Sequence, residues 1–238
     1  MYAAQAPPRP AHRRFPGGPP LAGLAAVSTV LFLTGVIAST AIARTAFPSP
    51  ADSATSILAY FHGHPDAVTV SGFFQFAAAV PLAIYAATIS SRLRSRGIRA
   101  PGATIALAGG TLAAAFLSIS GLVTWTLAQP AALASPPLVR ALADLAFATG
   151  GPGSVVPFGL LIAGLAVPAA FAALLPRWLA ATGLIIALAA EFSTLSLLAG
   201  GFAYLLPLAR FAGLAWLITA GALLPKARSA ASGLVPEH

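Results

Sequence analysis

Two charged side chains lie inside apolar stretches near the C-terminal end of the chain. Glu191 precedes the glycine pair at 200–201 by nine residues, and Arg210 follows that pair by nine. If the chain turns at the glycines, two antiparallel helices place both groups at one level, about 14 Å from the turn. A lone charge inside a bilayer costs from about 3 to more than 10 kcal/mol. We therefore predict that Glu191 and Arg210 form an intramembrane charge pair.

This predicted pair has two interpretations that the sequence leaves open. It is either a structural staple that fixes the register of two helices, or part of a site for a substrate, a proton or an anion. Gln75 lies at a similar depth, about 12 Å along its own stretch. Thr194 belongs to a set of serines and threonines in the odd-numbered apolar stretches. Gln75 and Thr194 are thus candidates for a polar pathway, with ordinary hydrogen bonds between helices as the alternative.

One short cluster, His62, His64 and Asp66, contains residue types that bind metals. Zn²⁺ usually takes three or four protein ligands, so this is a weak zinc candidate, and we favour solvated loop residues. The chain has no cysteine, no histidine inside an apolar stretch, and no nucleotide-binding glycine motif. We predict no metal and no cofactor, and we assign no catalytic residue.

Composition indicates which solvent surrounds these residues. Of 238 residues, 58% are hydrophobic and 8% are charged, whereas soluble domains carry roughly a quarter charged residues. The net charge of +8 does not indicate nucleic acid, because the basic residues lie in short segments between apolar runs and form no single face. The lipid bilayer is the expected partner, and a membrane protein partner or a homo-oligomer remains open.

Six stretches are apolar and long enough to cross the bilayer as helices, at residues 21–43, 67–90, 103–128, 154–176, 179–200 and 202–224. A span needs about 20 apolar residues to cross roughly 30 Å of hydrocarbon. We predict an all-α polytopic transmembrane helix bundle over residues 21–225, because helices satisfy their own backbone polar groups in lipid. Residues 1–20 and 226–238 are predicted tails. A cleaved signal peptide at 1–43 is an alternative.

Basic residues predict the orientation of the bundle. The N-terminal tail, the even-numbered loops and the C-terminal tail together hold ten arginines and lysines, whereas the odd-numbered loops hold two. Positive residues near helix ends favour the cytoplasmic side. We therefore predict a multi-pass protein of the cell membrane, inner or plasma, with both termini in the cytoplasm.

The chain also contains a predicted internal repeat. Residues 48–86 align without gaps with residues 135–173, with identities at 13 of 39 positions. The repeat units, 21–90 and 103–176, are parallel helical hairpins, followed by a hairpin at 179–224. Each repeat loop is predicted to hold a short helix on the outer interface. Pro81 and Pro168 occupy equivalent positions and predict helix kinks that open space between the hairpins.

Two segments carry a resemblance to a known kind of protein: HGHPDAVTVSGFFQFAAAVPLAIYAATI (62–89) and LARFAGLAWLITAGALLP (208–225). The chain resembles an uncharacterised family of six-span bacterial, actinobacterial-type membrane proteins with a domain of unknown function. The resemblance implies the six-span fold, and it implies no activity and no site residues.

Two classes of function follow from these observations. We favour a non-enzymatic accessory, sensing or stabilising membrane protein, and the alternative is a transporter of a small solute, protons or an anion that uses Glu191 and Arg210. An enzyme is not expected, because the apolar stretches hold one carboxylate. A cavity that reaches Glu191 favours transport, whereas a sealed core with the pair in contact favours the accessory role.

Overall fold

The computed structural model describes residues 18–97 and 101–224, and the helices there contain six segments long and apolar enough to cross a membrane. No strand occurs in these described ranges. The predicted all-α polytopic bundle is therefore confirmed. Most of the predicted tails at 1–20 and 226–238, and the first part of the possible signal peptide, lie outside the described residues.

The described ranges contain nine α-helices and two short 3₁₀ turns. They are α1 (Leu21–Ala43), α2 (Ala54–Gly63), α3 (Pro65–Ser95), α4 (Gly102–Leu127), α5 (Pro130–Leu133), α6 (Pro136–Gly150), α7 (Pro152–Phe171), α8 (Arg177–Phe192), η1 (Ser193–Leu197), η2 (Gly200–Tyr204) and α9 (Leu205–Leu223). Of these, α2 and α5 lie outside the six segments.

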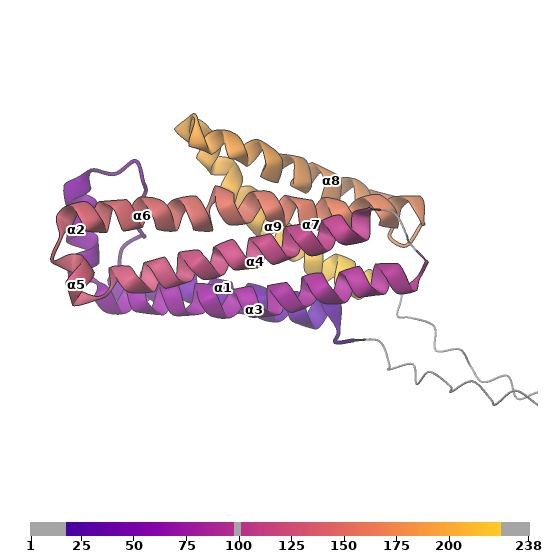
Figure 1. Ribbon diagram of the computed structural model, residues 1–238, viewed down its shortest axis with the longest axis horizontal. Coiled ribbons are helices and arrows are strands. Elements are labelled where there is room, and N and C mark those ends of the chain that lie inside the picture. Colours follow the sequence, from indigo (N-terminus) through magenta and orange to yellow (C-terminus); the bar gives the residue numbers. More distant parts are fainter. Residues whose placement is uncertain (1–17, 98–100, 225–238) are drawn as a thin grey trace, which may run out of the picture.

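The bundle has two different ends, which Figure 1 places at its right and left. At the right, α1 begins, α9 ends, and α3 ends after Arg92 and Arg94; we call this the basic end. At the left, α2 and α5 cross the ends of the long helices; we call this the cap end. The first and the last described residues therefore both lie at the basic end, as an even number of crossings requires.

Close helix contacts in the core depend on small residues. A Cβ added to Gly72 of α3 would lie 2.7 Å from the carbonyl oxygen of Gly121 of α4, and one on Gly121 would lie 2.8 Å from the carbonyl oxygen of Gly72. The α3 and α4 backbones therefore touch here, as small residues allow in lipid. Tyr85 is fully buried further along α3, and its hydroxyl donates to the Leu217 carbonyl at 3.4 Å.

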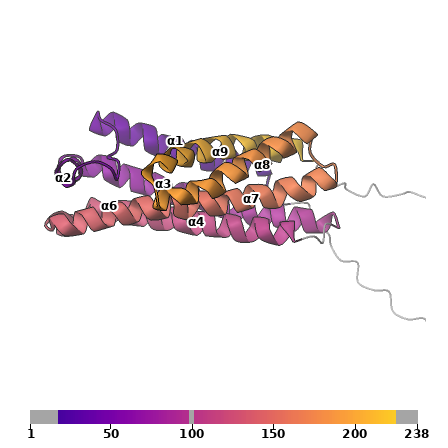
Figure 2. The same ribbon diagram turned by 90° about the horizontal axis from the view of Figure 1, so that it is seen from above.

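The second loop helix forms at the predicted place in the chain, but it is oriented differently from the helix of the first loop. Residues 136–150 form α6, which runs in line with α7 as one apolar segment, Pro136–Phe171, and α7 covers most of the predicted span at 154–176. Figure 2 shows α6 and α7 following one another along α4. The reason is the α6 face that packs on α4, where Val139, Ala146 and Gly150 are buried. The helix of the first loop, α2, instead crosses the ends of the long helices.

The repeat and the proline kinks stay predictions. In both hairpins the returning helix begins at a proline, Pro65 of α3 or Pro152 of α7, but their connecting segments differ as described above. Pro81 lies inside α3 and Pro168 inside α7, and both helices continue past them. A further proline, Pro157, lies inside α7.

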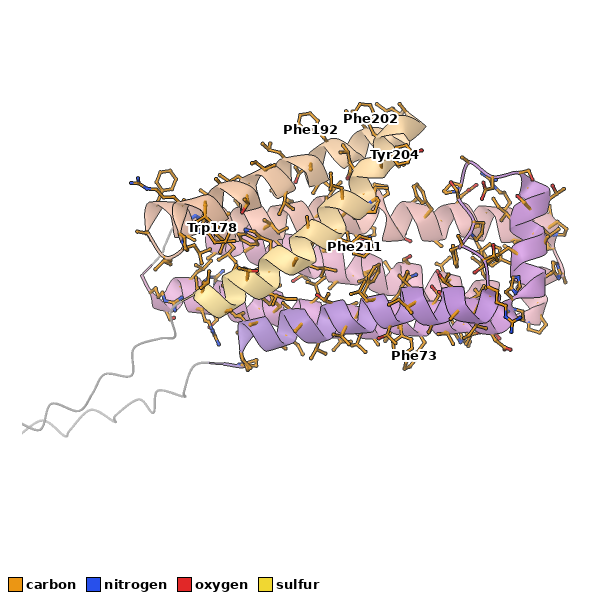
Figure 3. The ribbon with its side chains drawn as sticks, turned by 180° about the vertical axis from the view of Figure 1, so that it is seen from behind. Phe73, Trp178, Phe192, Phe202, Tyr204 and Phe211 are labelled. Atoms are coloured by element: carbon orange, nitrogen blue, oxygen red, sulfur yellow. The ribbon has the colours of Figure 1, made fainter. Side chains whose placement is uncertain are left out.

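α1 and α9 form a V that opens toward the cap end. A Cβ on Gly221 of α9 would lie 2.7 Å from the backbone nitrogen of Ala22, so the two helices touch at the basic end. Figure 3 shows α9 rising away from α1 as both run toward the cap end. The tip of the α8–α9 hairpin, with Phe202 and Tyr204, ends short of the cap end and away from α1.

Candidate functional site

Arg210 of α9 is the charged residue around which the candidate site is built. Its Nη2 atom donates to the carbonyl oxygen of Gly150 and, at 2.7 Å, to the hydroxyl of Ser154. The guanidinium carbon lies 5.0 Å from the centre of the Phe32 ring on α1, which is within cation–π range. These contacts tie α9 to α1 and to the junction of α6 with α7.

The Gly150 carbonyl is available to Arg210 because the helix is interrupted at this junction. Pro152 has no N–H, and Gly151 leaves the helical conformation with φ −80° and ψ −108°. The backbone N–H groups of Ser154 and Val155 both donate to the Gly151 carbonyl, at 3.2 and 2.9 Å. The Gly150 oxygen therefore accepts instead from Arg210 and from the Ser154 hydroxyl, the latter at 2.5 Å.

Some N–H groups of Arg210 make no hydrogen bond to the described residues. A guanidinium has five N–H donors, and the bonds that Arg210 makes to the described residues all come from Nη2. Nε and Nη1 donate to none of these residues, and neither is sealed away from a neighbouring space. Unsatisfied donors inside a membrane protein are costly, so these N–H groups are suited to a ligand or to water.

A cavity of about 320 Å³ provides that space. It extends from Arg210 toward the cap end, between α1, α6 and α9, and reaches the segment Phe47–Pro50 that precedes α2. Its apolar walls include Phe32, Val36, Phe61, Phe147, Leu206 and Phe211. Its polar lining comes from Arg210, Gln75, Ser120, Thr124, Ser49 and Asp144. The cavity is therefore apolar along its length and cationic at one end.

Gln75 lines this cavity and belongs to a short polar network. Its Oε1 accepts from the Ser120 hydroxyl at 3.2 Å, and its Nε2 donates to the Ser71 hydroxyl at 3.3 Å. The Ser120 hydroxyl is also 2.9 Å from the Ala146 carbonyl. The structure thus brings Gln75 to the cavity of Arg210, as the predicted polar pathway requires. The amide retains one N–H without a partner among the described residues.

Arg210 also lines a second, much smaller cavity of about 30 Å³. This second cavity lies nearer the basic end, and its walls include Ser28, Leu82, Leu117 and Leu214. Phe32 and Arg210 line both cavities, so these two side chains separate one from the other. Beyond the smaller cavity, the core around Leu161 and Leu217 is fully buried.

The predicted pair of Glu191 and Arg210 is not formed, and this prediction is corrected. Glu191 is exposed on α8, with its Oε1 beside Gly159 of α7. Arg210 instead faces the α6–α7 junction, because the interrupted helix offers it the Gly150 carbonyl. Among the described residues, the ion pair that does form joins Arg140 and Asp144. Thr194 is exposed in η1 and does not line the cavity, so its predicted place in a polar pathway is also wrong.

The weak metal candidate is not supported by the geometry. In the described ranges, no three histidine, cysteine, aspartate or glutamate side chains gather closely enough to hold a metal ion. His62 and Asp66 are exposed, and the ring of His64 packs 5.2 Å from the ring of Tyr60. His62 lies in the last turn of α2, His64 between α2 and α3, and Asp66 in the first turn of α3, at the cap end.

The wall of the cavity at the cap end is held in place by Arg140 of α6. Its Nε donates to Asp144 at 2.9 Å, and its two terminal nitrogens donate to the carbonyls of Asp52 at 3.2 Å and Pro50 at 3.0 Å. One side chain thereby fixes the segment before α2 to α6. Ser49 and Pro50 of that segment line the cavity beside Asp144.

Sequence reasoning missed Gly150, Ser154 and Phe32 as partners of Arg210. The signal for the first two was present as Gly150-Gly151-Pro152-Gly153-Ser154, a helix-breaking run inside an apolar stretch. No comparable signal distinguishes Phe32 from the other aromatic residues of the chain.

Comparison with known proteins adds no relative. No family model, no curated protein and no solved structure matches this chain. The resemblance to an uncharacterised bacterial membrane family therefore stays a prediction, and the function is argued from the site.

Proposed function

We propose that this multi-pass membrane protein binds a small anion at Arg210, as the substrate site of a carrier for small anionic solutes. The observation that carries the proposal is that Arg210, whose Nε and Nη1 donate to none of the described residues, lines a cavity of about 320 Å³ inside the helix bundle. Cavities of roughly 300–1,000 Å³ are typical of ligand sites.

Charge supports the binding of an anion. Arg210 is the one basic side chain among the described residues that line the cavity, and the acid there, Asp144, already pairs with Arg140. An intramembrane charge without a counterion is expensive. An anion that takes the free donors of Arg210 supplies this counterion, and the Gln75 amide adds a further donor in the same cavity.

A second candidate function is the non-enzymatic accessory or sensing role. It is favoured by the closed packing beyond Arg210, where Leu161, Ile162 and Leu165 have no exposed surface. In that role the ligand binds and dissociates on the same side, without crossing. Neither candidate requires covalent chemistry, and we propose that the protein is not an enzyme.

Binding is tested first, with the full chain in lipid nanodiscs. We expect sodium salts of acetate, benzoate, decanoate or phosphate to raise the thermal unfolding midpoint at constant ionic strength, and Arg210→Gln to abolish the rise. Arg177→Gln is the matched control, because Arg177 is exposed at the basic end and does not line the cavity. The absence of any anion effect on the parent protein would contradict the proposal.

Transport is then separated from sensing. The bound anion, in radiolabelled form, is followed across the membrane of proteoliposomes that contain the parent chain or Arg210→Gln. Flux that needs Arg210 supports the carrier. Binding without flux supports the accessory role and contradicts the carrier.

We further propose that the protein lies in the cell membrane with the basic end in the cytoplasm. The support is the cluster of Arg92, Arg94 and Arg96 at one end of the bundle. The chain has no cysteine, so Ser95→Cys and Ser49→Cys report the two ends separately. A membrane-impermeant maleimide added to intact cells is expected to label the second variant and spare the first.

A further inference from the structure

The lining of the cavity includes partly exposed side chains from both helices of the V. Val36 of α1 and Phe211 of α9 line it, and they are 42% and 43% exposed. Figure 3 shows the V of α1 and α9 opening beside the labelled Phe211. Both helices are candidate spans, so this opening faces lipid.

The walls inside the opening are apolar. Phe32, Phe61, Phe147 and Leu206 line the cavity together with Arg210. A strongly hydrated ion gains nothing from such walls, because it loses its hydration and finds few polar partners. An apolar body attached to the anion is stabilised by the same walls.

The charge of the site limits the charge of the ligand. Because Arg210 is the one basic side chain among the described lining residues, a monoanion is neutralised there, whereas a dianion keeps an uncompensated charge at low dielectric. Because Nη2 is already occupied by Gly150 and Ser154, a carboxylate is held there by charge and by single hydrogen bonds from Nη1 or Nε. The volume of about 320 Å³ lies at the small end of ligand sites and suits one chain or ring rather than a two-chain lipid.

We infer that the ligand is a single-chain or single-ring amphipathic carboxylate, which reaches Arg210 from the membrane through the opening between α1 and α9. This inference rests on the proposed anion site and adds the chemical class and the route. The carboxylate accepts from Arg210 and Gln75, and the apolar body lies along Phe32 toward Phe211.

The ligand class is tested by binding of radiolabelled decanoate to the chain in nanodiscs. Unlabelled decanoate and benzoate are expected to compete, whereas acetate, phosphate and decanol are expected to compete at least about tenfold less well. Phosphatidylglycerol incorporated in the disc distinguishes a lipid head group from a free acid, and it is expected not to displace decanoate. If acetate competes as well as decanoate, the anion site stands and the amphipathic ligand is wrong. If phosphatidylglycerol displaces decanoate, a lipid head group replaces the free acid.

The route is tested by closing the opening. Val36→Trp is expected to slow decanoate association about tenfold or more, with Val30→Trp as the control. Val30 is 60% exposed on the same helix and does not line the cavity. Unchanged association in Val36→Trp would overturn the lateral route.

A second measurement covers the case in which Val36→Trp does not fold. Val36→Cys is expected to react with a membrane-soluble maleimide, and decanoate is expected to slow that reaction in proportion to its occupancy. Val30→Cys is expected to react at a rate that decanoate does not change. Equal protection of both cysteines, or of neither, would contradict occupancy of the opening. If the parent chain binds none of the tested anions, the proposed function itself is overturned.

Discussion

Arg210 donates to the carbonyl of Gly150, the last residue of α6, at the point where Pro152 interrupts the α6–α7 segment. The contact pairs two polar groups that each lack a regular partner inside the helix bundle. The interrupted helix has a carbonyl that leaves the regular ladder, and α9 has a charge that lacks an acidic partner among the described residues. Each group satisfies part of the need of the other.

Ser154→Ala is expected to destabilise the chain by about 1 kcal/mol. The hydroxyl accepts from Arg210 and donates to the Gly150 carbonyl, so its loss weakens both ends of the contact. The measurement is the free energy of unfolding in mixed micelles. Ser95→Ala is the control, because Ser95 is exposed at the end of α3 and bonds its own helix. Equal values for the two variants would contradict a role of Ser154 at this junction.

Changes at Glu191 and Arg210 are expected to be additive. The two side chains are not paired, so the free-energy changes of Glu191→Gln and Arg210→Gln should sum to that of the double variant within about 0.5 kcal/mol. Glu191→Gln alone should have little effect on anion binding. A coupling energy above about 1 kcal/mol would restore the charge pair that the spacing around the glycine turn predicts.

The failure of that pair shows where sequence reasoning stops. Counting residues from the turn at 200–201 gives depth along a helix, and depth alone places Glu191 and Arg210 together. It does not give the rotation of each helix about its axis, which packing decides. The rotation of α9 is fixed by the Gly150 carbonyl, from a segment 60 residues away in sequence.

The orientation of the second loop helix was not predictable for a related reason. The fold class and the segments with a long apolar run were predictable, because hydrophobicity over about 20 residues is sufficient to recognise a span. The face of α6 that packs on α4 carries Val139 and Ala146, whereas Leu138 and Leu145 of the predicted apolar stripe stay exposed. An amphipathic pattern shows that one face is covered, and it does not identify whether lipid or protein covers it. Gln75 was found from sequence because a lone amide in an apolar run is conspicuous.

The close contact of α3 with α4 predicts a strong effect of one added methyl group. Gly72→Ala and Gly121→Ala each place a Cβ within 2.8 Å of a carbonyl oxygen on the facing helix. We expect each variant to lose about 1–3 kcal/mol of stability, because the two backbones must separate. Gly63→Ala at the end of α2 is the control, since no atom lies within 4 Å of its added Cβ. We expect the Gly63 variant to have a higher thermal midpoint than the Gly72 and Gly121 variants. The reverse order would contradict the close packing of α3 on α4.

Arg140→Lys is expected to loosen the segment before α2 while it changes global stability little. Arg140 is 36% exposed, and its pair with Asp144 is therefore worth less than about 1 kcal/mol. Its other donors hold the carbonyls of Pro50 and Asp52, and a single ammonium group does not reach all three partners with the planar fork of arginine.

The measurement is the rate of maleimide labelling at Ser49→Cys in the Arg140→Lys background. We expect a faster rate, because Ser49 belongs to the segment that Arg140 fixes to α6. Arg94→Lys is the matched control, since Arg94 is exposed at the basic end and donates there to Thr104. Because this segment also lines the cavity of Arg210, loosening it should speed the release of bound decanoate as well. A faster labelling rate with unchanged release would assign release to the opening between α1 and α9 alone, whereas an unchanged labelling rate would show that Arg140 does not hold the segment.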